Sequence, residues 1–355
     1  MPAAGKLSGE EYSRRNSMKA CVFAGNNQVE LRDVPFEELK SGMIRVKVNY
    51  CAICATDEHV VRHGLFSCSP GIVLGHEVSG VVAELGPDTE NSGFKVGDRV
   101  VGTPLRHCGQ CYYCRTGRQM YCSGYSDFVF GGMAEYKVYS KNCLFKIPDS
   151  LPLRNAALVE PLTCVMRAMD LANIRQGDDV CLSGLGGIGL LMLQAIKFKG
   201  AGRIAVIEPI KEKRELALKL GADYAIDPVH ESVTDRAMTI TDGYGFNVIV
   251  ECSGARSAAP VCIDIAAKCG TVVYFAVYPT DYEMPLNLFN CYCKELRIQT
   301  VYSHTEIVPR AINFISKLAL NDIIGAEFPL EKCSEAFDAF ASKKYPKVLI
   351  KCSND

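Results

Sequence analysis

The 355-residue sequence has almost no net charge and no long apolar run, and each absence argues against a class of protein. Its 39 lysine and arginine residues are balanced by 40 aspartate and glutamate residues, which gives a formal net charge of −1. Without an excess of basic residues, the chain has no field that would hold a nucleic acid or an anionic membrane surface. No segment reaches the roughly 20 apolar residues that a membrane-spanning helix requires. We therefore expect neither a nucleic acid nor a membrane as a partner.

The first 17 residues also lack an apolar run. They are polar and mixed in charge, which is not the composition of a secretory signal. We expect residues 1–17 to form a flexible N-terminal extension before the first strand. Eighteen cysteines in a long chain without an export signal indicate metal ligands and buried free thiols in a reducing compartment, rather than disulfides. The expected location is the cytoplasm.

The chain length favours two domains, and the pattern of strand-like and helix-like runs changes along the sequence. The first part consists of short β-branched runs separated by turn residues, and from about Asp179 strand-like runs alternate with helix-length stretches. The alternation predicts a doubly wound parallel sheet. We predict an α/β protein in which a dinucleotide-binding domain, residues 158–295, is inserted between two parts of a β-rich domain, residues 18–157 and 296–355. The predicted strands are 18–23, 44–48, 78–84, 99–101, 180–182, 204–207, 247–250, 271–275 and 347–351, and the predicted helices are 188–199, 211–220 and 258–268.

Four cysteines share one short loop: Cys108, Cys111, Cys114 and Cys122, with the spacing C-x2-C-x2-C-x7-C. At the cysteine content of this chain, the spacing would arise by chance about 0.002 times. Four thiolates brought together by short loops suit a closed, tetrahedral zinc site that supports the fold. An iron–sulfur cluster is the alternative, although no proline follows the last cysteine and no redox relay is evident.

A second candidate metal site combines residues that are far apart in the sequence. Cys54 lies in CAICATDEH, His76 lies in LGHEVSG and Glu160 lies in VEPL. Each has an ordinary explanation on its own, since a single cysteine is usually a core residue and a glutamate before proline usually belongs to a loop. Together, a thiolate, an imidazole and a carboxylate are the mixed ligands of a catalytic zinc, and three protein ligands leave the fourth position for water or substrate.

A glycine-rich turn marks the candidate dinucleotide site. GxGxxG patterns would occur by chance about 0.2 times in this chain, but here a strand precedes the motif, an apolar helix follows it, and the next strand ends at Glu208. The pyrophosphate would rest on the helix N-terminus. Glu208 would accept hydrogen bonds from the adenosine ribose and repel a 2′-phosphate, so we expect NAD rather than NADP. Alternatively, Glu208 is an acidic residue that stabilises the next helix. The predicted cofactor-binding residues are Gly184, Gly186, Gly187, Ile188, Gly189, Glu208 and Lys213.

These motifs occur in an order that resembles the zinc-containing alcohol dehydrogenases of the medium-chain dehydrogenase/reductase family. The resemblance runs from about Met18 to Cys352 and is carried by C-x-T-D-x-H at 54–59, GHE-x-x-G at 75–80, the four-cysteine loop and GxGxxG. It implies a GroES-like catalytic domain with a Rossmann domain, two zinc ions per chain, and a homodimer or homotetramer.

The resemblance also assigns roles around the second metal. It implies Cys54, His76 and Glu160 as catalytic zinc ligands, with Glu77 as an alternate ligand or a neighbour of the ligands. Zinc can lower the pKa of an oxygen ligand to about 7, which helps an alcohol to lose its proton before hydride transfer. Thr56 and His59 follow Cys54 closely enough to relay that proton through the cofactor ribose, the role that the resemblance implies for them. Alternatively, His59 is a solvated surface histidine.

The acidic Glu160 looks most like the sorbitol, threonine and butanediol dehydrogenase branches. This implies a small secondary alcohol with a second polar group (a polyol, diol or amino alcohol) or the matching ketone. Sorbitol itself is disfavoured. The resemblance implies that a sorbitol dehydrogenase has an arginine, which binds substrate hydroxyls, followed by a tyrosine at this place. This chain has Val301-Tyr302-Ser303-His304 there, and no arginine lies between Arg297 and Arg310. The alternatives are a simple alcohol or aldehyde enzyme of the same family and a non-enzymatic relative, which would be expected to have lost a residue such as Cys54.

Overall fold

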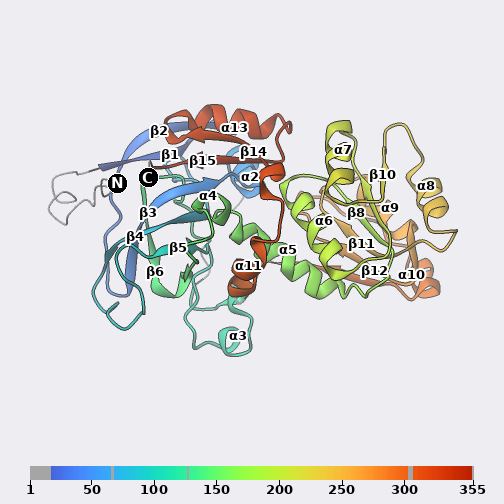
Figure 1. The fold of residues 1–355 in the computed structure, drawn as a ribbon, viewed down its shortest axis with the longest axis horizontal. Helices are drawn as coiled ribbons and strands as arrows, with labels where there is room; N and C mark the ends of the chain where they lie inside the picture. Colours follow the sequence, from blue (N-terminus) through green and yellow to red (C-terminus); the bar gives the residue numbers. More distant parts are fainter. Residues whose placement is uncertain (1–16, 65–67, 126–127, 303–306, 354–355) are drawn as a thin grey trace. The chain divides into compact units, whose positions relative to one another are not determined.

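The structure is a computed structural model that describes residues 17–64, 68–125, 128–302 and 307–353 (Figure 1). Of the predicted N-terminal extension, only Ser17 lies within the described residues. The chain divides into two compact units. The first comprises residues 1–161, 304–320 and 324–355, and the second comprises residues 162–303 and 321–323.

The first unit is built on a seven-stranded sheet in the order β14-β15-β3-β4-β5-β7, with β6 also paired to β3. Alternating β-branched residues on β3, such as Val46 and Val48, are fully buried in its core. β15 pairs with β3, so the end of the chain joins the sheet that the N-terminal part begins. The strands of this unit are β1 (Ser17–Gly25), β2 (Gln28–Pro35), β3 (Met43–Ala52), β4 (Glu77–Leu85), β5 (Arg99–Gly102), β6 (Tyr136–Ser140), β7 (Leu144–Lys146), β14 (Ile324–Pro329) and β15 (Lys347–Lys351).

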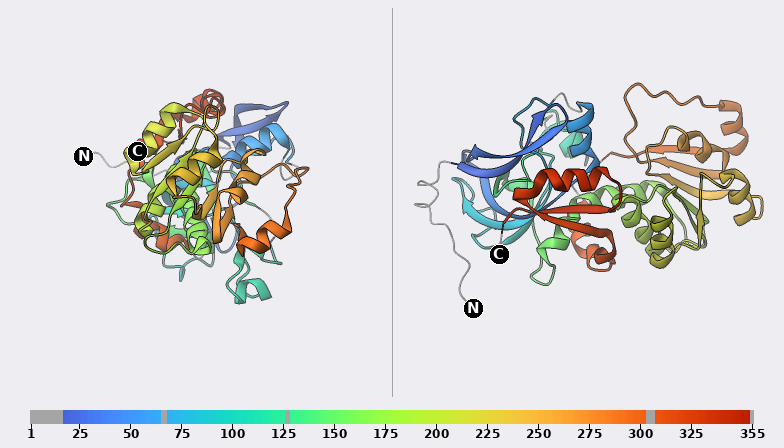
Figure 2. Two further views of the ribbon diagram at one scale, coloured as in Figure 1. Left: turned by 90° about the vertical axis from the view of Figure 1, so that its right-hand side faces the viewer. Right: turned by 90° about the horizontal axis from the view of Figure 1, so that it is seen from above.

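Short helices surround this sheet. α13 packs against β2, β14 and β15. In the right-hand view of Figure 2 this red helix lies beside the red strands. α2 begins directly after β3 and ends at Gly64, which adopts the left-handed conformation that favours glycine. The helices assigned wholly to this unit are α2 (Ala55–His63), α3 (Tyr112–Arg115), α4 (Leu153–Ala156), α11 (Val308–Ile315) and α13 (Cys333–Ala341), while α5 (Val159–Ala172) starts in the first unit and α12 (Leu320–Ile323) lies at the border.

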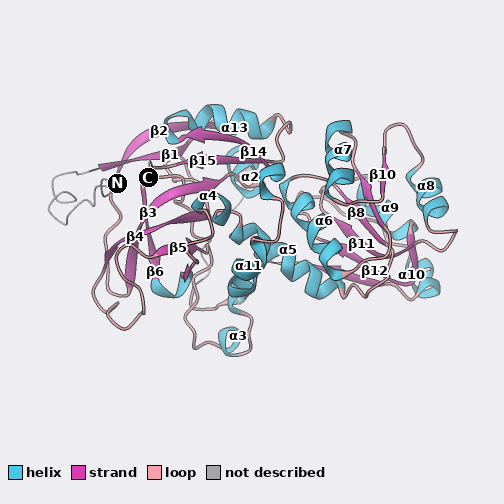
Figure 3. Cartoon of the chain, viewed as in Figure 1, coloured by secondary structure: helices cyan, strands magenta, loops and turns pink. Residues whose placement is uncertain are grey.

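The second unit is a six-stranded parallel sheet in the order β10-β9-β8-β11-β12-β13. This is the strand order of a doubly wound dinucleotide-binding fold, and the order reverses between β8 and β11. The predicted α/β class with a parallel sheet is therefore confirmed. Figure 3 labels its strands β8, β10, β11 and β12 among the surrounding helices. The strands are β8 (Val180–Ser183), β9 (Ile204–Ile207), β10 (Tyr224–Ile226), β11 (Phe246–Glu251), β12 (Ala266–Tyr274) and β13 (Arg297–Thr300), and the helices are α6 (Gly187–Lys199), α7 (Lys211–Leu220), α8 (Val233–Ile240), α9 (Ala258–Asp264) and α10 (Leu288–Lys294).

Two sequence predictions differ from the structure. The helix predicted over 258–268 ends at Asp264, because β12 starts at Ala266, which pairs with Phe246 of β11. The predicted domain border at residue 296 falls before β13, whereas β13 pairs with β12 and is the sixth strand of the parallel sheet. The second unit accordingly extends to residue 303 and begins at 162 rather than 158. Among the described residues, none of the helices has the length and apolar character needed to cross a bilayer.

Candidate metal and cofactor sites

Three of the predicted site residues meet where β3, α2 and β4 join. Cys54 precedes the first turn of α2, and Glu77 opens β4 opposite Ala52 of β3. Gly75 has a φ of +89°, and a Cβ there would lie 2.6 Å from the sulfur of Cys51, so this turn requires glycine. One ligand atom each of Cys54, His76 and Glu77 can be chosen so that all three lie within 4.8 Å of one another.

Asp57 connects the segment of Cys54 to the segment of Gly75 and His76 by hydrogen bonds, and the sequence analysis missed it. Its carboxylate is fully buried and accepts hydrogen bonds from the backbone N–H of Cys54 and of Gly75, both at 2.9 Å. Its Oδ1 also lies 3.6 Å from Nδ1 of His76. A carboxylate beside the imidazole orients the ring and raises its basicity. The available signal was the acidic residue in the first turn of a helix whose N-cap is Cys54.

Lys347 supplies the cation of the site and was also missed. Its Nζ lies 2.6 Å from the carboxylate of Glu77, and both side chains are buried. Burial alone would lower the pKa of Lys347, but the Glu77 carboxylate outweighs it and the pKa is raised. Burial raises the pKa of Glu77, and the lysine opposes that effect. The two residues are 270 positions apart, so no local pattern reveals the pair.

Glu160 lies outside the group formed by Cys54, His76 and Glu77, although it is buried in the first turn of α5. Burial raises the pKa of its carboxyl to about 7, while the charge of His76 acts in the opposite direction. The structure thus places Glu77 with the other two residues, whereas the family resemblance gave that place to Glu160. Each remains a candidate ligand.

The donor set fits a zinc ion. A thiolate, an imidazole and a carboxylate are its usual ligands in an open site. Burial disfavours the charged form of His76, yet the pKa of His76 is raised because Asp57 and Cys54 outweigh burial. That balance marks an excess of buried negative charge, which a divalent cation would neutralise. Phe128 and Phe130 place their rings 4.8 and 5.9 Å from the His76 ring, centroid to centroid, which limits access of water.

The predicted relay residues lie on α2 beside this cluster. Oγ1 of Thr56 is 3.6 Å from the sulfur of Cys54. His59 is half-buried and lies about one helical turn further along α2. The relay itself remains a prediction.

The four-cysteine loop brings its sulfurs together as a tetrahedral zinc site requires. Four sulfurs at about 2.3 Å from one zinc ion are about 3.8 Å apart. The sulfur of Cys114 lies 3.9 Å from that of Cys108 and 3.5 Å from that of Cys111, and the sulfur of Cys122 lies 3.9 Å from that of Cys111. A hydrogen bond to the backbone at Cys114 lowers the pKa of Cys111 to about 5, which favours its thiolate.

The glycine-rich turn connects β8 to α6 at the point where the strand order of the second unit reverses. Gly184 has a φ of +94°, and a Cβ there would lie 2.8 Å from Ser253, which follows β11. A Cβ on Gly189 would lie 2.1 Å from the carbonyl oxygen of Gly184, so helix and strand can approach only because this residue is glycine. Gly186 is the N-cap of α6, so the first amides of the helix, from Gly187 on, are available to a pyrophosphate.

Glu208 follows β9, as predicted. Its Oε2 accepts a hydrogen bond from the backbone N–H of Leu185 at 2.9 Å, and its Oε1 accepts one from Ile210 at 3.0 Å. The carboxylate is therefore held against the glycine-rich turn, with lone pairs remaining for ribose hydroxyls. Lys213 lies in α7, half-buried.

Comparison with known proteins agrees with this geometry. The chain matches the family Alcohol dehydrogenase GroES-like domain over residues 40–149 and the family Zinc-binding dehydrogenase over residues 187–317. It is 34% identical to the L-threonine 3-dehydrogenase of Pyrococcus horikoshii, covering 90% of this chain and 94% of that protein. It is 31% identical to a sorbitol dehydrogenase of Halalkalibacterium halodurans, covering 94% and 99%. A solved alcohol dehydrogenase of Escherichia coli CFT073 in complex with NADH superposes with a TM-score of 0.87 at 25% identity, covering 95% and 100%.

The chain belongs to the zinc-containing alcohol dehydrogenases of the medium-chain dehydrogenase/reductase family. It is an oxidoreductase that acts on the CH–OH group of small alcohols and uses zinc and a nicotinamide dinucleotide.

We predict that the purified protein holds two zinc ions per chain, one for each ligand cluster. Cys111→Ser should remove one of them and lower the thermal unfolding midpoint, because a structural zinc contributes directly to the free energy of folding. Elemental analysis and circular dichroism measure both effects. Cys293→Ser, at an exposed cysteine outside both clusters, is the control and should keep two ions. One zinc per wild-type chain, or iron, would contradict the prediction.

A double-mutant cycle tests the buried pair of Glu77 and Lys347. Lys347→Met leaves a buried carboxylate unpaired and should lower the free energy of unfolding by about 3–5 kcal/mol. The double variant with Glu77→Gln should lose clearly less than the two single losses added together. Arg154→Met, which breaks the more exposed ion pair with Glu327, should cost under about 1 kcal/mol and serves as the control. Additive losses in the cycle would show that the pair is not coupled.

Proposed function

We propose that the substrate is a small secondary alcohol that carries a second polar group: a polyol, a vicinal diol or an amino alcohol. The observation that carries the proposal is the concentration of buried carboxylates around Cys54 and His76, namely Asp57, Glu77 and Glu160. A carboxylate that does not bind the metal is an acceptor for a second hydroxyl or an amine, and an acidic site suits a neutral or cationic substrate. The names of the relatives, a threonine and a sorbitol dehydrogenase, support the same class. Ser303 and His304, which bear on sorbitol itself, lie outside the described residues.

The proposed chemistry divides between the bound groups and the chain. Zinc, when bound, supplies a Lewis acid for the alcohol oxygen, and the nicotinamide ring accepts the hydride. Cys54 and His76, with Glu77 or Glu160, would hold the metal, while Asp57 orients His76. Thr56 would accept the hydroxyl proton as it releases its own into the relay, and His59 would deliver a proton from the end of the relay to solvent.

We further propose NAD as the preferred cofactor. Glu208 supports this, because a buried carboxylate at the end of the second strand of the parallel sheet repels a 2′-phosphate. Gly184, Gly186, Gly187, Ile188 and Gly189 would carry the pyrophosphate, and Lys213 would lie at the adenosine side.

A homodimer or homotetramer is the proposed assembly. β13 is an edge strand of the parallel sheet, and on it and the preceding α10 several large apolar side chains are exposed: Leu288, Phe289, Tyr292 and Ile298. An unpaired edge beside an apolar patch is an unfavourable surface for an isolated chain. The proposed location is the cytoplasm, which is consistent with eighteen cysteines of which none forms a disulfide.

The substrate proposal is tested by comparing 2,3-butanediol with 2-butanol, which differ by one hydroxyl group. Buried polar groups that pair with a second hydroxyl reject an analogue without it, so kcat/KM should favour the diol by about a thousandfold or more. 3-Amino-2-butanol, compared in the same assay, shows whether an amine is preferred to the hydroxyl. NADH absorbance follows the reaction. Equal kcat/KM values for the diol and 2-butanol would refute the proposal and favour a simple alcohol or aldehyde substrate.

A further inference from the structure

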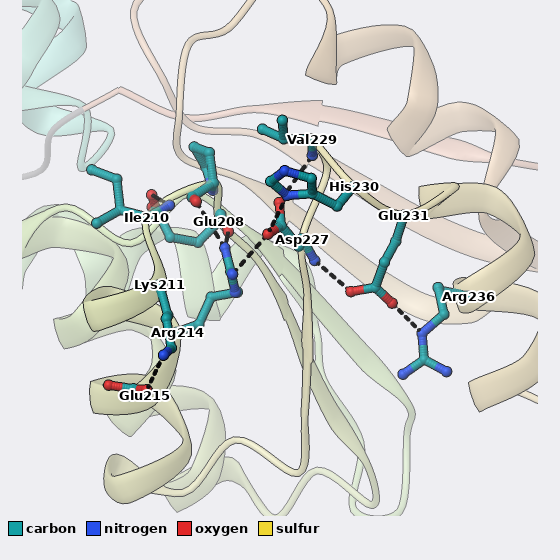
Figure 4. A network of polar contacts seen from close by, with 11 residues as sticks. Glu208, Ile210, Lys211, Arg214, Glu215, Asp227, Val229, His230, Glu231 and Arg236 are labelled. Carbon is teal, nitrogen blue, oxygen red and sulfur yellow. Dashed lines mark hydrogen bonds and ion pairs between the residues drawn. The ribbon is translucent and has the colours of Figure 1, made fainter.

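Arg214 contacts the backbone of Glu208, the residue that is proposed to select NAD. Arg214, in the first part of α7, turns its guanidinium back toward the loop that carries Glu208 (Figure 4). Its Nη1 donates hydrogen bonds to the carbonyl oxygens of Glu208 at 2.7 Å and of Pro209 at 2.8 Å. The arginine is 15% exposed, so its charge lies mostly within the unit.

Asp227 holds this arginine in place. It follows β10, the strand next to β9, so the two loops leave the same edge of the parallel sheet. One carboxylate oxygen accepts a hydrogen bond from Nη2 of Arg214 at 2.7 Å, and the other accepts one from the backbone N–H of Val229 at 3.0 Å. His230 approaches the same carboxylate at 3.0 Å. These contacts lower the pKa of Asp227, and the hydrogen bond with His230 has the largest effect. The carboxylate therefore remains charged near neutral pH.

The position of Arg214 would otherwise favour the wrong cofactor. A guanidinium beside the end of the second strand is the group that accommodates the 2′-phosphate of NADP. Here three of its five N–H donors are used by two carbonyl oxygens and one carboxylate, and the charge of Asp227 neutralises its own. Glu208 is therefore next to a cation whose charge is compensated by Asp227 and whose Nη1 donors are both engaged.

We propose that Asp227 is a specificity-determining residue: it holds Arg214 on the Glu208 backbone and so keeps the arginine from binding a 2′-phosphate. The same contacts fix the loop from which Glu208 faces the glycine-rich turn. Selection of NAD thus has two parts, repulsion by Glu208 and sequestration of Arg214 by Asp227. This inference rests on the proposed preference for NAD.

The test uses the full chain with zinc and four variants: Glu208→Ser, Glu208→Ser with Asp227→Asn, the triple variant that adds Arg214→Met, and Glu208→Ser with Glu231→Gln. Asparagine keeps the shape of Asp227 and an acceptor for Val229 but removes the charge. Glu231 is the control because it belongs to the same network and pairs with Arg236, and within the described part of the chain it forms no ion pair or hydrogen bond with Arg214. kcat/KM is measured with NAD and with NADP, and NADP binding is measured by calorimetry, which needs no turnover.

Glu208→Ser should raise kcat/KM for NADP relative to NAD. Adding Asp227→Asn should raise that ratio about tenfold further, the effect of one new hydrogen bond between charged groups, and should tighten NADP binding by a similar factor. Adding Arg214→Met should cancel this second gain, and Glu231→Gln should not produce it.

The outcomes separate the inference from the proposal beneath it. If the wild-type enzyme prefers NADP, or if Glu208→Ser leaves the ratio unchanged, the proposed NAD preference fails and the inference fails with it. If Glu208→Ser relaxes selection but Asp227→Asn adds nothing, the inference alone is wrong. A gain that persists after Arg214→Met also overturns it, because the arginine would then not be the group that binds the phosphate.

Discussion

Buried negative charge at the junction of β3, α2 and β4 is the constraint on which the structure of the first unit depends. A thiolate and several carboxylates within a β-sheet core cost free energy unless cations and hydrogen bonds compensate them. The chain provides one compensating cation, Lys347, and a set of backbone amides that satisfy Asp57. The remaining excess of charge is what would favour a divalent metal at this site.

This constraint explains why the two ends of the chain meet in one unit. Lys347 reaches Glu77 only because β15 pairs with β3, although the residues of the parallel sheet lie between these two strands in the sequence. The four-cysteine loop differs from this site, since its four sulfurs would complete the coordination of one zinc ion and leave no open position. In the second unit, buried charges are likewise compensated by hydrogen bonds. Two backbone amides hold Glu208, and carbonyl oxygens together with Asp227 hold Arg214.

The sequence predicted what local patterns encode. Strand runs, the GxGxxG turn and the cysteine spacing each lie within a few tens of residues, and the parallel sheet was predicted correctly. What it did not reveal depends on long-range pairing. Lys347 resembles any lysine at the start of a strand, and Asp57 resembles an ordinary acidic residue in a first helical turn. The helix predicted to run to Lys268 was cut short by pairing of Ala266 with β11, and β13 was assigned to the wrong domain because its sequence is short and polar.

The most direct test of the account is a stopped-flow measurement of hydride transfer in His76→Ala, together with the zinc content and NADH affinity of the same sample. The account requires that the cluster of Cys54, His76 and Glu77 acts through a bound metal. It predicts that the rate of hydride transfer falls by about a thousandfold or more while the affinity for NADH stays within about twofold of the wild type. Hydride transfer at a near-normal rate, with zinc absent from that site, would contradict it.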